Sequence, residues 1–432
     1  MKVHVPGDKS LTQRALILSA LAEGESRISG VLWGGDAEST ATALRALGAG
    51  IPILPPDGSE IVVRGVGLTG LRSPKSELDL GNSGTGARLL LGVMSGSAIA
   101  TTMTGDESLR SRPMRRVTEP LSAMGAGFEF LCHEGQLPIH ICGKRPLHQI
   151  DWSTPVASAQ VKSAILFAAL TGGASTLVTE PERSRDHTER LFRRVGVPTL
   201  SHAVAEGWCI ELRDPPDRIG ELDFPVPGDV SSAAFLLALA AIGGTSAGSI
   251  EIGSVGLNPT RTGFLDVLQR MGTEITIEPD DEDEDGEASG TISAKASDLI
   301  GTQVDAVEVP HMIDELPLVA VLGARAVGET SIRGAQELRK KESDRIDALV
   351  RNLRVLGVEV EEHDDGLTVL GSHRPLEGRV RVFDDHRIAM AFGVLGAAPG
   401  NDIEVDHPQI SAVSFPGFWE LAHDLGAGRA AR

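Results

Sequence analysis

The chain repeats one local pattern six times, and this repeat restricts its possible folds more than any other feature. In each copy, a helix with apolar periodicity closes on a glycine, and residues of alternating polarity typical of strands follow. The six glycines lie 69 to 85 residues apart, at Gly48, Gly125, Gly196, Gly272, Gly357 and Gly426. Glycine there fits the left-handed residue that ends a helix. The 432 residues therefore divide into six units of about 72 residues, a spacing too regular for coincidence.

Each unit also opens alike, with small polar or acidic residues of the helix N-cap type before a strongly apolar helix. Together with the glycine endings, this predicts roughly a βαβαββ order in every unit. The opening at residues 5–8 (VPGD) returns at 226–229. A solenoid is the alternative architecture for such repeats, but the abrupt return favours two globular α/β domains of three units each, at residues 9–227 and 228–432.

The charge and composition exclude several classes of protein. The formal charge is −20, with 60 acidic and 40 basic residues, which argues against binding nucleic acid. Part of that charge lies in residues 280–287 (DDEDEDGE), expected to form a solvated loop. There is no apolar run long enough to span a membrane and no signal peptide. The three cysteines are too few for a disulfide framework, so we expect a soluble cytoplasmic protein.

Cationic residues recur beside the helix openings, which indicates binding of small anions. Helix N-termini attract negative charge, and arginine and lysine strengthen that attraction. The cations in these segments are Lys9, Arg14, Arg88, Arg110, Arg112, Lys162, Arg183, Arg185, Arg339, Lys340, Lys341, Arg345 and Arg387. Any single one could equally form a surface ion pair. The whole set predicts a ligand with several negative groups.

Three residues in the second half are candidates for moving protons. Asp314 precedes an apolar helix, where it could serve as a base or simply cap the helix. Glu342 lies between Lys341 and Arg345, where it could carry a proton or form an i,i+3 ion pair. His386 could support catalysis or cap a helix. Metal-binding, P-loop and dinucleotide motifs are missing, so no metal and no cofactor are implied.

Six short motifs, in order along nearly the whole chain, resemble those of the EPSP synthase family of enolpyruvyltransferases. They are residues 6–10 (PGDKS), 80–85 (LGNSGT), 158–164 (SAQVKSA), 184–189 (SRDHTE), 341–345 (KESDR) and 385–391 (DHRIAMA). The resemblance implies two inside-out α/β domains that close over an active site in the interdomain cleft. Residues 1–8 would join the C-terminal domain.

The resemblance further implies transfer of the enolpyruvyl group of phosphoenolpyruvate to the 5-hydroxyl of shikimate 3-phosphate, with release of phosphate. Asp314 would be the base for the hydroxyl and Glu342 the proton donor to the methylene carbon, with Lys9 and Lys341 also catalytic. Shikimate 3-phosphate would contact Lys9, Ser10, Arg14, Ser158, Ala159, Gln160, Arg185, Asp314 and Lys341. Phosphoenolpyruvate would contact Lys9, Gly84, Arg112, Gln160, Arg345 and Arg387. Asn82 and His386 would support the site, and the protein would act as a monomer.

Two positions depart from the family pattern. The segment after Lys9 reads SLTQR, so Gln13 stands where histidine is usual, and Val413 replaces a lysine that reaches phosphoenolpyruvate in some members. The nearest rival, UDP-N-acetylglucosamine 1-carboxyvinyltransferase, usually needs a loop cysteine near residues 110–112, where this chain has none. An inactive copy that only binds anions is a second alternative, although such a protein would not need the proton carriers.

Overall fold

The computed structural model describes residues 2–280 and 286–426. Within these ranges the chain forms two compact units, which are described separately. One unit contains residues 7–226 together with 286–287, and the other contains residues 2–6, 227–280 and 288–426. We call them the N-terminal unit and the C-terminal unit. No helix in the described ranges is long and apolar enough to cross a membrane.

The N-terminal unit is an α/β structure with three small sheets. Its helices are α1 (Lys9–Leu21), α2 (Gly35–Ala46), α3 (Gly84–Ser95), α4 (Glu107–Ser111), α5 (Arg115–Ala123), α6 (Ala159–Gly172) and α7 (His187–Arg194). Its strands are β2 (Glu25–Ser29), β3 (Ile61–Arg64), β4 (Leu78–Asp79), β5 (Ala100–Thr104), β6 (Gly127–Phe130), β7 (Ile139–Cys142), β8 (Ile150–Ser153), β9 (Thr176–Glu180), β10 (Leu200–Val204), β11 (Gly207–Leu212) and β12 (Asp223–Pro225). The strand orders are β12-β2-β3, β4-β5-β7-β6 and β10-β11-β9-β8.

The C-terminal unit also has three small sheets. Its helices are α8 (Val230–Ala241), α9 (Gly263–Arg270), α10 (Leu316–Gly323), α11 (Arg345–Val355), α12 (His386–Ala397) and α13 (Phe418–Asp424), with 3₁₀ turns η1 (Val309–His311), η2 (Gln336–Lys340) and η3 (Pro408–Val413). Its strands are β1 (Lys2–Val3), β13 (Ser249–Gly256), β14 (Ile275–Pro279), β15 (Ser289–Lys295), β16 (Gln303–Val304), β17 (Glu329–Ile332), β18 (Glu359–His363), β19 (Gly366–Leu370), β20 (Glu377–Val380) and β21 (Asp402–Val405). They pair as β1-β13-β15-β14, β16-β17-β19-β18 and β20-β21.

The predicted α/β class and the repeat are confirmed, because one sheet corresponds to each of the six units. All six terminating glycines have positive φ, between 76° and 108°, as the left-handed helix ending requires. The order βαβαββ is seen from β8 to β11, from β12 to β15 and from β16 to β19, and from β4 to β7 with the short helix α4 added before α5. The first unit has β3 alone after its second helix, and the last has α13 after β21 with no further strand in the described residues.

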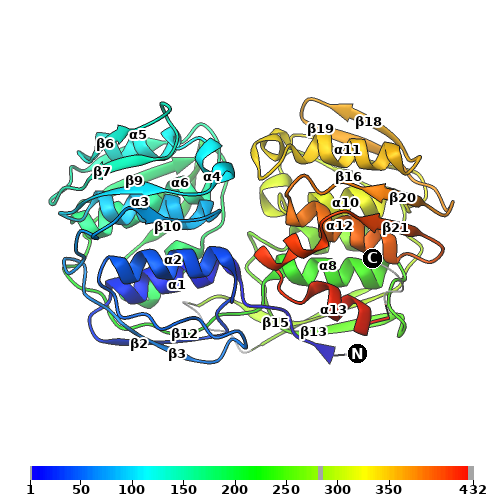
Figure 1. Cartoon of the computed structure of the whole chain (residues 1–432), viewed down its shortest axis with the longest axis horizontal. Coiled ribbons are helices and arrows are strands. Elements are labelled where there is room, and N and C mark those ends of the chain that lie inside the picture. Colours follow the sequence, from blue (N-terminus) through cyan, green and yellow to red (C-terminus); the bar gives the residue numbers. More distant parts are fainter. Residues whose placement is uncertain (1, 281–285, 427–432) are drawn as a thin grey trace. The chain divides into compact units, whose positions relative to one another are not determined.

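The opening helix of each unit is buried and the second helix is amphipathic. Every residue of α8 and α10 is buried, and so are all but the first few residues of α1 and α6. Helices that are apolar all round can only be stable inside a core. In both units the strands lie around these helices (Figure 1), and the helices lie in the core. The predicted site residues on these helices lie at or near the helix N-termini.

Candidate functional site

In the N-terminal unit, the first turn of α1 carries three of the predicted binding residues. The Asp8 carboxylate accepts a hydrogen bond from the Leu11 amide at 2.8 Å and so caps the helix. Lys9 Nζ lies 3.2 Å from Asp36 Oδ2, and its side chain stays partly exposed. Arg14 is buried and donates to Ser10 Oγ at 2.7 Å, so it orients that hydroxyl. Burial lowers the pKa of Arg14 to about 10, although nearby Glu189 opposes this, and the side chain remains a cation at neutral pH.

The start of α3 meets the start of α6 through a short polar network. Ser83 caps α3 by accepting from the Gly86 amide, and Gly84 is the first helical residue. Arg88, one turn on, donates to Gly84 O at 3.1 Å and to Gln160 Oε1 at 3.0 Å. Gln160 Nε2 in turn donates to Thr85 Oγ1 at 3.0 Å. The network holds the predicted residues Gly84 and Gln160 together on neighbouring helix N-termini.

Arg112 and Asn82, both predicted, contact each other directly. Arg112 Nη2 donates to Asn82 Oδ1 at 2.6 Å, and Asn82 Nδ2 donates to Asp106 Oδ2 at 2.7 Å. Asp106 also caps α4 through the Leu109 amide. A guanidinium held in this way can bind a carboxylate or a phosphate through two parallel hydrogen bonds.

Glu180, which was not predicted, holds two predicted segments in place. Its Oε1 accepts from the Ser158 amide at 2.9 Å, next to Ala159 at the start of α6. Its Oε2 accepts from Ser184 Oγ at 2.7 Å, next to the half-buried Arg185. Buried Lys162 neutralises Glu180 at 3.2 Å and Glu189 at 2.8 Å. Burial alone would lower the pKa of Lys162, but the carboxylates of Glu189 and Glu180 outweigh it and raise that pKa.

Arg14, Arg88, Arg345 and Arg387 of the predicted anion-binding set are also buried, but Lys162 differs from Arg345 in that all of its carboxylate partners are fully buried too. It is fully buried in an ion triad, so its role is to support the start of α6 rather than to contact a ligand. Burial also raises the pKa of Glu189, against the pull of Lys162.

In the C-terminal unit, Arg345 is the centre of a cluster that contains the predicted proton carriers. Its side chain is 1% exposed and contacts Asp385 Oδ2 at 2.7 Å, Glu342 Oε2 at 2.7 Å and Asp314 Oδ1 at 3.3 Å. Burial alone would lower the pKa of Arg345, but Asp385, Glu342 and Asp314 raise it well above its usual range. The arginine is therefore a permanent cation that fixes three carboxylates around it.

Asp314 lies among three cations of this cluster. Lys341 Nζ is 3.3 Å from its Oδ1, and Arg387 Nη1 donates to its backbone oxygen at 3.1 Å. The alternative in which Asp314 caps the following helix is wrong, because α10 begins at Leu316 with Glu315 at the cap position and no side-chain cap bond. The Asp314 carboxylate instead forms ion pairs with Lys341 and Arg345, both at 3.3 Å.

The start of α12 contributes the remaining predicted residues. Asp385 caps this helix by accepting from the Arg387 amide at 2.9 Å, so the capping role considered for His386 falls to its neighbour. Both His386 and Arg387 are buried. Glu315, unpredicted, accepts from Arg387 Nη1 at 3.4 Å and from Ser231 Oγ, which ties the starts of α8, α10 and α12 together.

The acidic run departs in part from the expected solvated loop. Residues 281–285 lie outside the described ranges. Glu287 is buried, however, and contacts His187 Nδ1 at 2.7 Å, while Arg190 donates to Gly286 O at 3.0 Å. The end of the run is therefore packed, because two basic side chains of α7 hold it.

Comparison with known proteins gives one consistent family. Residues 1–421 match the model of the family described as EPSP synthase (3-phosphoshikimate 1-carboxyvinyltransferase). The chain is similar to 3-phosphoshikimate 1-carboxyvinyltransferases of Alkalilimnicola ehrlichii (46% identical, covering 98% of this chain and 93% of that protein) and Gluconobacter oxydans (46%, covering 99% and 95%). It is also similar to the solved structure of EPSP synthase from Acinetobacter baumannii, with a TM-score of 0.84, 38% identity and coverage of 99% and 96%.

Proposed function

The chain belongs to the EPSP synthase family and has the activity of a 3-phosphoshikimate 1-carboxyvinyltransferase, and we propose that its two polar clusters divide the work of this reaction. The cluster of the N-terminal unit binds the anionic groups of both substrates. The cluster of the C-terminal unit moves the protons. The observation that carries the second assignment is that Asp314 and Glu342, the two proton carriers expected from the sequence, contact the same buried Arg345.

The substrates, shikimate 3-phosphate and phosphoenolpyruvate, together carry two phosphates and two carboxylates, so they need many cations and helix N-termini. We assign shikimate 3-phosphate to Lys9, Ser10, Arg14, Ser158, Ala159, Gln160, Arg185, Asp314 and Lys341. We assign phosphoenolpyruvate to Lys9, Gly84, Arg112, Gln160, Arg345 and Arg387. Buried Arg14 and Arg345 would act largely by fixing Ser10 and the carboxylate cluster, respectively.

The reaction is proposed to proceed by addition and elimination. Asp314 takes the proton of the 5-hydroxyl, whose oxygen attacks C2 of phosphoenolpyruvate, while Glu342 gives a proton to C3 and makes it a methyl group. Lys341 and Arg345 stabilise the charge that changes during this step. In the elimination step, Glu342 takes a proton back from the methyl group, and phosphate leaves with the proton held by Asp314. Glu342 is then protonated again and Asp314 is ionised again.

A phosphate-release assay with a choice of acceptors tests this function. Phosphoenolpyruvate with shikimate 3-phosphate is expected to release phosphate, and phosphoenolpyruvate with UDP-N-acetylglucosamine is not. Release only with the sugar nucleotide would transfer the assignment to the rival enolpyruvyltransferase. Release with neither acceptor would show that the protein is an inactive copy that only binds anions.

Glu180→Gln is expected to raise KM for shikimate 3-phosphate about tenfold, with smaller changes in kcat and in KM for phosphoenolpyruvate. The carboxylate positions the Ser158 amide and the Ser184 hydroxyl, and one displaced hydrogen bond is worth about 1 kcal/mol or more. Steady-state kinetics with each substrate varied measures this split. Exposed Glu182→Gln is the matched control. A lower melting temperature with both KM values unchanged would mean that Glu180 acts only on stability.

Gly84→Ala is expected to raise KM for phosphoenolpyruvate about tenfold while the protein stays folded. A Cβ at Gly84 would lie 2.9 Å from Arg112 Nη1 and 2.9 Å from Arg88 Nη1, so these guanidinium groups must shift. They are ends of flexible side chains, which is why the fold tolerates the methyl group. Gly35→Ala, also at the first position of a helix but with open space around it, is the control. An unchanged KM for phosphoenolpyruvate would show that Gly84 and Arg112 do not contribute to binding this substrate.

We further propose that the enzyme acts as a monomer in the cytoplasm. The support for a monomer is that each unit has a hydrophobic core of its own, built from residues of one chain. Light scattering of the purified protein with and without substrates checks the oligomeric state.

A further inference from the structure

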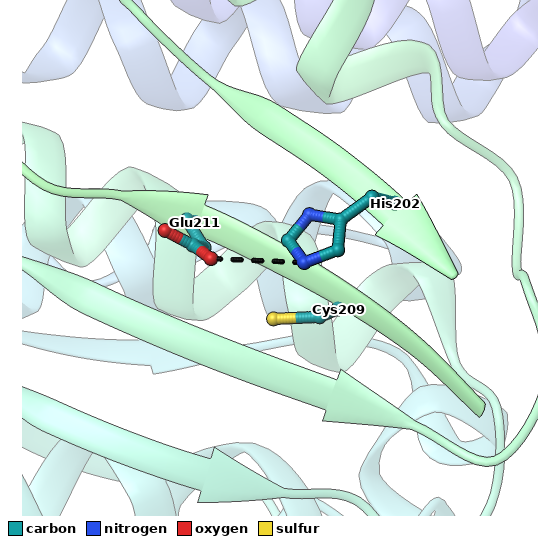
Figure 2. A group of neighbouring side chains, drawn as sticks. All are labelled: His202, Cys209 and Glu211. Carbon is teal, nitrogen blue, oxygen red and sulfur yellow. Dashed lines mark ion pairs between the residues drawn. The ribbon is translucent and has the colours of Figure 1, made fainter. Parts of the chain in front are cut away.

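Three metal-ligating side chains gather on β10 and β11, on the face of the sheet opposite to that of Glu180. In the antiparallel pairing of these strands, His202 lies opposite Cys209, and Glu211 is two residues further along β11. Side chains alternate along a strand, so all three lie on the same face of the sheet, as Figure 2 shows. Ile210 and Leu212 point to the opposite face and belong to the core.

The geometry points to a divalent metal site, and we propose that His202, Cys209 and Glu211 bind one Zn²⁺. Their ligand atoms lie within 4.8 Å of one another, with His202 Nε2 at 3.8 Å from Glu211 Oε1. Adjacent ligand atoms of a tetrahedral zinc ion lie roughly 3.3 to 3.7 Å apart, given bond lengths of about 2.0 to 2.3 Å. The cluster is therefore about 1 Å more open than a filled site. Half-exposed His202 can close that difference by rotating its side chain.

The donor set suits zinc better than the hard cations. The imidazole nitrogen is a borderline ligand and the thiolate sulfur a soft one, and magnesium and calcium favour neither. The carboxylate oxygen is a hard ligand that zinc also accepts. Three protein ligands leave the fourth position to water, on the solvent side where His202 is exposed. Binding forms an S–Zn bond and releases the thiol proton to the buffer.

The surroundings orient the ligands and favour a cation. Glu211 Oε2 accepts from Arg213 Nε at 2.6 Å, which leaves Oε1 to face His202. Thr179 lies directly beside Cys209 on the neighbouring strand β9. Burial raises the pKa of the Cys209 thiol, and Glu211 and Asp151 raise it further, whereas Arg213 opposes them.

Binding would clamp the edge of a sheet rather than take part in the transfer reaction. β10 is the edge strand in the order β10-β11-β9-β8. A metal shared by β10 and β11 joins this edge to the interior strand. Since it would bind only the folded hairpin, it would raise the melting temperature of the protein.

The test is a titration of the metal-stripped full chain with Zn²⁺ against a chromophoric chelator. One equivalent is expected to bind, and His202→Ala and Cys209→Ser are expected to weaken binding by at least roughly 100-fold. Exposed Cys142→Ser and exposed His133→Ala are matched controls and should bind like the unmodified chain. Phosphate-release activity should be the same with and without the metal.

Cobalt substitution gives a readout that does not depend on the stability of a variant. Co²⁺ bound to the unmodified chain is expected to show a thiolate-to-cobalt charge-transfer band, which Cys142→Ser retains. Glu211→Gln, a near-isosteric change, should weaken Co²⁺ binding without unfolding the strand. Absence of the band, or Zn²⁺ affinity that is equal in Cys209→Ser and the unmodified chain, would overturn the proposal.

Discussion

Asp314→Asn is expected to lower kcat by about 10²- to 10⁴-fold and to leave binding of shikimate 3-phosphate largely intact. The amide cannot take the proton of the 5-hydroxyl, although it has nearly the same shape. Arg345 keeps its contacts with Asp385 and Glu342, both at 2.7 Å, so the buried cation is still neutralised and the unit should fold. Initial rates of phosphate release and calorimetric binding of shikimate 3-phosphate measure the two quantities separately.

Asp347→Asn is the matched control for this substitution. Asp347 is in the first turn of α11 in the same unit, and its carboxylate contacts only exposed Arg351 among the ion pairs of the described residues. Its substitution should leave kcat within about twofold, because exposed ion pairs contribute little. If Asp314→Asn kept most of the turnover, Asp314 would be a structural partner of Arg345 and Lys341 and another group would be the base.

Glu342→Gln is expected to lower kcat by a similar factor, about 10²- to 10⁴-fold, with little change in either KM. The neutral amide can accept a hydrogen bond but cannot give a proton to C3 of phosphoenolpyruvate. Glu342 is partly exposed while its Oε2 contacts Arg345 at 2.7 Å, so it is positioned and still accessible to a ligand. Steady-state kinetics, with thermal unfolding as a check on folding, gives the result.

Glu337→Gln controls for loss of a glutamate near the same segment, because Glu337 forms an ion pair at 3.3 Å with exposed Lys340 of the same 3₁₀ turn. A variant Glu342→Gln with a raised KM for phosphoenolpyruvate and unchanged kcat would contradict a proton-transfer role. It would show instead that Glu342 positions Arg345 for binding.

Much of the fold could be predicted because it is repeated. A glycine after each second helix has an elementary cause, the positive φ that ends a helix, and all six glycines have it. The first and last units could not be predicted as well. Residues 2–3 pair with β13, which belongs to the fourth repeat, and β12, at the end of the N-terminal unit, pairs with β2 of the first repeat. Local periodicity does not encode such long-range pairing.

The site could be predicted where a motif lies at a helix start, and it was missed where support comes from elsewhere. Asp385, Glu315 and Asp36 hold Arg345, Arg387 and Lys9 through contacts between segments far apart in sequence. Glu180 follows an alternating strand pattern, and only its complete burial beside Lys162 reveals its role. In the sequence, the signal that could have indicated this role is an acidic residue at the end of a strand pattern together with a lone lysine in an apolar helix.

The His202, Cys209 and Glu211 cluster was missed for a different reason. Its ligands do not follow a metal motif, because the spacing comes from the register of a hairpin rather than from a loop or helix turn. The alternate positions of Cys209 and Glu211 on one strand were visible in the sequence. That His202 lies opposite them depends on the turn between β10 and β11, which sequence periodicity does not determine.

Deuterium incorporation during turnover in D₂O tests most directly whether C3 of phosphoenolpyruvate is protonated and deprotonated during the reaction, as addition and elimination require. Phosphoenolpyruvate without deuterium is converted with shikimate 3-phosphate, and the methylene group of the product is examined by NMR. Because C3 becomes a methyl group during the proposed reaction, we expect deuterium in that methylene group of the product. Glu342→Gln should slow its appearance together with phosphate release. Complete conversion to a product with no deuterium at C3 would contradict the account, because the carbon would never have been protonated.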